Sequence, residues 1–146
     1  MQQDQAFLAE QVYRGENSVA YVLLVEDDAW QAELVQRMLE RDQHEVKVLL
    51  NSQQILDVIK DRKPHIVITD INMPGFDGVE VIKAIKEHDP DIKVIAFTAV
   101  GVTGTEEKAR EAGCDAYLNK PMNVEEFRNF VKQHLEDVHD SNTSVT

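Results

Sequence analysis

The sequence HIVITDINMPG, residues 65–75, decides the fold of this chain. Its apolar, β-prone first half predicts a buried strand that ends at Asp70, because the Pro74-Gly75 pair follows closely and stops the strand. Asp70 is therefore expected at the carboxyl end of a buried strand, facing a loop. Ligands and chemistry gather at that edge in open α/β sheets, so Asp70 is the first candidate functional residue.

Other β-prone segments alternate with amphipathic segments along the chain. The predicted strands, besides the one that ends at Asp70, are Tyr21–Val25, Val46–Leu50, Lys93–Thr98 and Ala116–Leu118. The segments after each strand carry apolar residues at helical spacing, and this pattern predicts five helices. Such alternation predicts an α/β fold in which parallel strands form one sheet covered by helices on both faces.

Polar residues at the expected starts of these helices are candidate N-caps, because their side chains can accept hydrogen bonds from free backbone N–H groups. The candidates are Asp28, Ser52, Asp77, Asn123 and a capping box formed by Thr103 and Glu106.

Both ends of the chain depart from the alternating pattern. Residues 1–18 are predicted to be an N-terminal extension that could hold a short helix, either frayed or docked on the domain. Residues 138–146 are polar and are predicted to form a disordered tail. Residues 19–137 then form a single domain, long enough for a sizeable core.

Composition excludes several classes of function. The net charge of −12 argues against direct binding to nucleic acid or to an anionic membrane, since both need clustered Lys and Arg. No apolar run approaches the roughly 20 residues that span a bilayer. Cys114 is the single cysteine, so no intrachain disulfide can form, and we expect it to be a small core residue of a cytoplasmic protein.

The histidines show no spacing typical of a metal site, and we expect them to face solvent. They are His44, His65, His88, His134 and His139.

Polar residues also stand at the ends of the other predicted strands. Glu26 and Asp27 follow the first strand, Thr98 ends the fourth, and Lys120 follows the fifth. Parallel strands bring these residues to the same edge as Asp70. Two carboxylates ~5 Å apart repel by roughly 3 kcal/mol at an effective dielectric near 20. The site therefore needs cations: Lys120 supplies one charge, and Mg²⁺ suits the remaining carboxylates.

The four strand ends together resemble the receiver domain of two-component response regulators. The residues that carry this resemblance are Leu24–Asp28, Thr69–Pro74, Phe97–Ala99 and Tyr117–Pro121. The resemblance extends over about residues 19–137. It implies a flavodoxin-like three-layer α/β/α fold, with five helices and a five-stranded parallel sheet in the order 2-1-3-4-5.

The resemblance also implies a phosphoacceptor site with bound Mg²⁺. Asp70 is the implied phosphoacceptor, which attacks phosphorus to form an acyl phosphate. The implied metal ligands are Glu26, Asp27, Asp70 and the backbone carbonyl of Asn72. Asp28 is an alternative ligand to Asp27, but we prefer Asp27 because Asp28 is better used as a helix cap.

Two further roles follow from the same resemblance. Lys120 and Thr98 are implied to contact the phosphoryl group. Thr98 and Tyr117 are the implied switch, which changes the surface around the fourth helix, fifth strand and fifth helix. The implied partners are a histidine kinase or histidine phosphotransfer protein as donor and a downstream protein effector. The module would assist its own phosphorylation and dephosphorylation but would not be an enzyme.

Two other functions compete with this interpretation. A Mg²⁺-dependent phosphohydrolase with an aspartate nucleophile also uses acids, Thr and Lys on an α/β sheet, but it needs an Asp-x-Asp loop after the first strand. A flavin- or nucleotide-binding module needs a loop there that attracts phosphate. The acids at residues 26–28 fit neither requirement.

Overall fold

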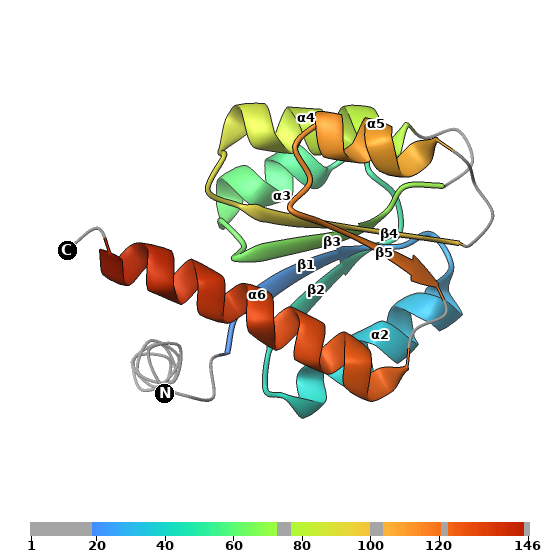
Figure 1. Cartoon of the computed structure of the whole chain (residues 1–146). Coiled ribbons are helices and arrows are strands. Elements are labelled where there is room, and N and C mark those ends of the chain that lie inside the picture. Colours follow the sequence, from blue (N-terminus) through green and yellow to red (C-terminus); the bar gives the residue numbers. More distant parts are fainter. Residues whose placement is uncertain (1–18, 73–76, 100–103, 121–122, 145–146) are drawn as a thin grey trace.

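The structure is a computed structural model that describes residues 19–72, 77–99, 104–120 and 123–144, with side chains up to Leu135 (Figure 1). Five parallel strands form one sheet in the order β2-β1-β3-β4-β5. The strands are β1 (Tyr21–Val25), β2 (Glu45–Leu49), β3 (Ile66–Asp70), β4 (Lys93–Ala99) and β5 (Ala116–Lys120). The predicted strand order is thereby confirmed.

Helices cover both faces of this sheet and complete three layers. The helices are α2 (Ala29–Arg41), α3 (Ile55–Asp61), α4 (Gly78–His88), α5 (Thr105–Glu111) and α6 (Val124–Ser144). Helices α2 and α6 lie on one face, and α3, α4 and α5 lie on the other (Figure 1). The flavodoxin-like α/β/α prediction is confirmed. No helix among the described residues has the length and apolar character needed to cross a membrane.

Strand β1 shows why the sheet is buried on both faces. All five of its residues are buried. Val22 and Leu24 belong to the core beneath α2 and α6, whereas Leu23 and Val25 belong to the core beneath α3, α4 and α5. Because alternate side chains of a strand point to opposite faces, a continuous apolar run is needed to fill both cores.

Three of the predicted helix caps are confirmed. Asp28 accepts hydrogen bonds from the first turn of α2, Asp77 does so for α4, and Asn123 does so for α6. The prediction for Ser52 was wrong, because the N-cap position of α3 is Gln54, which makes no capping bond through its side chain.

Two predictions fall on residues outside the described ranges. These are Thr103, the first member of the proposed capping box, and the short helix within residues 1–18.

Helix α6 continues to Ser144, so its backbone is helical over residues 138–144, within the segment for which the sequence predicts a polar tail. A helix already nucleated at its N-terminal end gains one backbone hydrogen bond with each added residue, and this favours extension even through polar sequence.

Buried residues confirm one side-chain prediction and correct another. Cys114 is buried, as expected. The prediction that the histidines face solvent was wrong for His44, which is buried and accepts a hydrogen bond from the Ala20 N–H through Nδ1. The Nδ1 of His65, a half-buried residue, accepts one from the Tyr21 N–H. Both imidazoles thus satisfy backbone donors where the chain enters β1.

These two histidines predict that the protein loses stability in mild acid. Burial lowers the pKa of His44 and of His65 below the ordinary value of 6.5. The unfolded chain therefore binds more protons than the folded one below about pH 6.5, and acid favours unfolding. The free energy of unfolding is expected to fall as pH drops from 7.5 to 5.5, by at most about 1.4 kcal/mol per pH unit for each histidine.

Urea denaturation at several pH values would measure this dependence. The variant His44→Asn keeps an acceptor for the Ala20 N–H but cannot titrate, so its dependence should be shallower. Equal slopes for the variant and the wild type would contradict the assignment to His44.

Candidate functional site

The carboxyl ends of the strands bring the predicted site residues to one edge of the sheet. Asp70 at the end of β3 pairs with Phe97 of β4, and Thr98 pairs with Asn119 of β5, next to Lys120. Glu26 directly follows β1, and its backbone N–H donates to the Leu49 carbonyl of β2. Parallel pairing alone therefore gathers groups that are far apart in the sequence.

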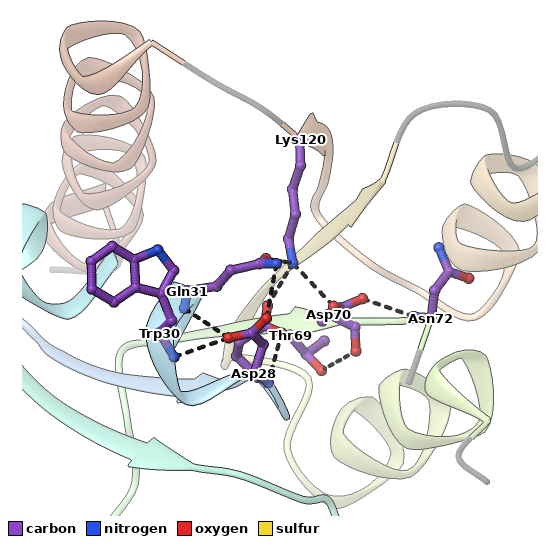
Figure 2. A network of polar contacts seen from close by, with 8 residues as sticks. Asp28, Trp30, Gln31, Thr69, Asp70, Asn72 and Lys120 are labelled. Carbon is purple, nitrogen blue, oxygen red and sulfur yellow. Dashed lines mark hydrogen bonds and ion pairs between the residues drawn. The ribbon is translucent and has the colours of Figure 1, made fainter. Parts of the chain in front are cut away.

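Lys120 lies at the centre of this edge. Its ammonium group donates to Glu26 Oε2 at 2.5 Å. It also donates to Gln31 Oε1 at 2.8 Å and to Asp70 Oδ2 at 3.0 Å (Figure 2). The side chain is 17% exposed. Since an ammonium group has three N–H donors, all of its hydrogen-bonding capacity is used by protein groups.

Asp70 is held from both sides of its carboxylate. Oδ1 accepts the Asn72 N–H at 2.8 Å, and Oδ2 accepts Lys120 (Figure 2). The Thr69 hydroxyl donates to the Asp70 backbone carbonyl at 3.1 Å. The residue is only 8% exposed, so these contacts fix the orientation of a nearly buried carboxylate.

Three carboxylates meet at this edge. Glu26, Asp27 and Asp70 can each offer an oxygen such that all three oxygens lie within 4.8 Å of one another. Glu26 and Asp70 are buried, and Asp27 is exposed. Three carboxylates and one ammonium leave a formal surplus of two negative charges. Oxygen ligands with this charge and an open side suit Mg²⁺, which keeps several waters when bound by carboxylates.

The pKa values of the paired groups reflect this crowding. Burial raises the pKa of Glu26, against the hydrogen bonds from Lys120 and the Asp28 N–H, and the charge of Asp70 adds to the rise. For Lys120, burial alone would lower the pKa, but its hydrogen bonds to Glu26 and Asp70 outweigh burial and raise it. Lys120 is thus held as a cation. Its single positive charge does not fully neutralise the two buried carboxylates of Glu26 and Asp70.

Asp28 has a separate role from its neighbours. Its carboxylate caps α2 by accepting the Trp30 N–H at 2.9 Å and the Gln31 N–H at 3.2 Å (Figure 2). It is not part of the three-carboxylate cluster. The preference for Asp27 as the candidate ligand therefore agrees with the geometry.

Thr98 and Tyr117 lie on the neighbouring strands β4 and β5, two residues apart in register. Within the described part of the chain, Thr98 Oγ1 is a buried side-chain atom without a hydrogen-bond partner. Burying a hydroxyl in this state costs roughly 1–3 kcal/mol, so a ligand oxygen at this position would relieve the cost. Tyr117 pairs in register with Ala96, two residues before Thr98, and is half-buried against the core beneath α3, α4 and α5.

The sequence analysis missed Gln31 as a member of the site. Its side chain bridges Lys120 and the Asp28 carboxylate, to which Nε2 donates at 3.4 Å (Figure 2). No sequence signal marked it, because a glutamine in the first turn of a helix has no distinctive pattern and its partner Lys120 lies 89 positions away.

The sequence is similar to those of known proteins. A family model described as the response regulator receiver domain matches residues 22–132. The polar-differentiation response regulator DivK of Brucella anthropi is 35% identical over 118 residues, which cover 80% of this chain and 96% of DivK.

Solved structures agree in fold. A response regulator receiver domain protein from Methanospirillum hungatei superimposes with a TM-score of 0.79 at 24% identity, covering 85% of this chain and 99% of that one. The BeF3-activated DrrB receiver domain superimposes with a TM-score of 0.73 at 30% identity, covering 81% and 98%.

The geometry predicts that Mg²⁺ affinity depends on Asp27 and not on its neighbour Asp28. A divalent ion and a carboxylate ~5 Å apart attract by roughly 1.7 kcal/mol even at the dielectric of water. Asp27→Asn should therefore weaken Mg²⁺ binding by about tenfold or more, as measured by isothermal titration calorimetry.

The matched control is Asp28→Asn, which removes the same charge one residue away and retains a good N-cap residue. Its Mg²⁺ affinity should stay within about threefold of the wild type, since its carboxylate is outside the cluster. Equal losses in the two variants would contradict the assignment of the ligand to Asp27.

Proposed function

This chain belongs to the response regulator receiver family, and we propose that it accepts a phosphoryl group on Asp70 and thereby controls the binding of a partner protein. The observation that carries the proposal is the contact of Lys120 with Asp70 and Glu26, which lie 50 and 94 positions away in the sequence. The same contacts surround a carboxylate that is oriented and nearly buried.

The proposed reaction is the transfer of a phosphoryl group to a carboxylate. An oxygen of Asp70 forms a bond to phosphorus, and the bond between phosphorus and the donor's imidazole nitrogen breaks. The electron pair of that bond stays on the imidazole nitrogen, which then takes a proton from solvent. The Asn72 N–H and Lys120 orient the attacking carboxylate, and positioning of this kind supplies much of the rate in phosphoryl transfer.

Glu26, Asp27 and Asp70 would hold the Mg²⁺, together with the backbone carbonyl of Asn72. The bound ion would supply charge neutralisation for the phosphoryl oxygens. Lys120 would contact one of these oxygens, and the free hydroxyl of Thr98 would donate to another.

The switch is proposed to run from Thr98 to Tyr117. Both residues lie on the face of the sheet that α5 covers, on adjacent strands. As the Thr98 hydroxyl moves toward the phosphoryl group, it vacates space into which the Tyr117 ring can turn. The surface formed by α5, β5 and α6 would then change, because phosphorylation favours the state in which these contacts are made.

The proposal assigns partners by the chemistry of each step. The donor is a histidine kinase or a histidine phosphotransfer protein, and the recipient of the signal is a downstream protein effector. Direct binding to nucleic acid or membrane is not part of the proposal, given the net charge of −12. We place the protein in the cytoplasm, where Cys114 would stay reduced. The module assists its own modification and turns over no external substrate.

The proposal predicts that Asp70 is the residue that becomes phosphorylated. Wild-type protein treated with acetyl phosphate and Mg²⁺ should gain one phosphoryl adduct by intact-mass spectrometry, and Asp70→Asn should gain none, because it lacks the nucleophilic oxygen. Asp77→Asn is a matched control, since Asp77 caps α4 outside the cluster, and it should be modified like the wild type. A full adduct on Asp70→Asn, or rapid multiple turnover of p-nitrophenyl phosphate by the wild type, would refute the proposal.

The proposal also predicts that the switch depends on the hydroxyl of Thr98. Thr98→Val keeps the shape of the side chain but removes the hydroxyl. It should still bind BeF3⁻, a mimic of the phosphoryl group, but with about three- to tenfold lower affinity, the usual range for one hydrogen bond. Hydrogen–deuterium exchange should show that BeF3⁻ alters α5, β5 and α6 in the wild type and much less in the variant. An unchanged exchange response in the variant would separate Thr98 from the switch.

A further inference from the structure

Gln31 is the one uncharged acceptor among the three that surround the Lys120 ammonium. The other two, Glu26 and Asp70, are carboxylates. Hydrogen bonds between an ammonium and a carboxylate are stronger than those between an ammonium and a neutral amide. When a new anionic acceptor approaches Lys120, the bond to Gln31 is therefore the one that is given up at the lowest cost.

We propose that Gln31 is a positioning residue that occupies the third N–H of Lys120 at rest and yields it to the incoming phosphoryl oxygen. This inference rests on the proposed function, because it needs a phosphoryl group on Asp70. It assigns Gln31 the resting contact that sets how readily Lys120 engages the phosphoryl group.

The position of Gln31 suits such an exchange. Its backbone N–H is bound by the Asp28 carboxylate at 3.2 Å, so the side chain starts from a fixed point in the first turn of α2. The amide Oε1 contacts Lys120 at 2.8 Å, whereas Nε2 makes only a long contact of 3.4 Å to Asp28 (Figure 2). The backbone is anchored, and apart from Lys120 the amide is held only by this long contact, so once Lys120 is released the side chain can turn away without disturbing the helix.

The charges at the site favour displacement of Gln31 from Lys120 by the phosphoryl group. A phosphoryl group brings about −1.5 to −2 charges and several strong acceptor oxygens. Lys120 cannot donate a fourth hydrogen bond. While the phosphoryl group approaches, before its bond to Asp70 forms, Glu26 and Asp70 are buried carboxylates that would be costly to leave without Lys120. Gln31 is half-buried, so its released amide can turn to water at little cost.

Two substitutions at residue 31 should act in opposite directions. Gln31→Met has a similar length but no strong acceptor, so Lys120 starts with one N–H facing water, and BeF3⁻ affinity should rise roughly three- to tenfold. Gln31→Glu places a charged acceptor on Lys120 and adds negative charge near the phosphoryl position. Its BeF3⁻ affinity should fall by about tenfold or more.

BeF3⁻ binding would be measured by ¹⁹F NMR at saturating Mg²⁺, and Mg²⁺ binding alone by calorimetry. Gln31→Met should leave the Mg²⁺ affinity within about twofold of the wild type, since Gln31 is not one of the three clustered carboxylates. The matched control is Gln36→Met in the same helix, where Gln36 contacts Glu40 and not the site. It should leave both affinities unchanged.

Opposite shifts in BeF3⁻ affinity for the two variants would support the proposal. Weaker binding in both variants would indicate that residue 31 only maintains the structure, and unchanged binding in Gln31→Met would show that its amide is not exchanged; either result overturns the inference. Wild-type protein that binds no BeF3⁻ at all would overturn the proposed function itself, whatever the variants do.

Discussion

Lys120 holds together an edge of the sheet at which three carboxylates would otherwise repel one another. Its contacts with Glu26 and Asp70 place one cation between two buried acids, and Asp27 completes the cluster from the solvent side. The raised pKa of Glu26 follows from its burial and from the charge of Asp70. The protein groups at the site therefore leave an excess of negative charge. This excess favours a divalent ion and makes the edge responsive to any change in charge.

The fold holds these charged groups close together because the strands that carry them are anchored in apolar cores. Strands β1 and β3 are buried along their whole length, so their positions are fixed by two cores at once. The site residues stand where the strands end, and the strand register sets their relative heights. A shift of one residue in any strand would turn its site residue toward the opposite face. Hydrophobic packing therefore provides the precision that the polar groups need.

The parts of the structure that could be predicted are those that follow from local pattern and parallel pairing. Apolar runs located the strands, and the polar residues that follow them located Asp70 and Lys120. Gln31 was missed because its contact with Lys120 joins residues 89 positions apart, and a glutamine in a first helical turn has no distinctive pattern. His44 was missed for a similar reason: a buried imidazole that accepts the Ala20 N–H looks, in sequence, like a polar residue in a loop. Long-range side-chain contacts such as these depend on how distant segments pack together, so the local sequence pattern does not indicate them.

Helix α6 spans 21 residues, which is about 30 Å at 1.5 Å per residue, whereas the strand before it spans five. Its backbone therefore projects well past the sheet (Figure 1). A rod of this length acts as a lever: a tilt of about 5° at its root moves its tip by roughly 2.6 Å. Its first residue, Val124, comes four positions after Lys120 in the sequence. Any tilt of the helix about this end would therefore produce its largest displacement at the distal end, near Ser144.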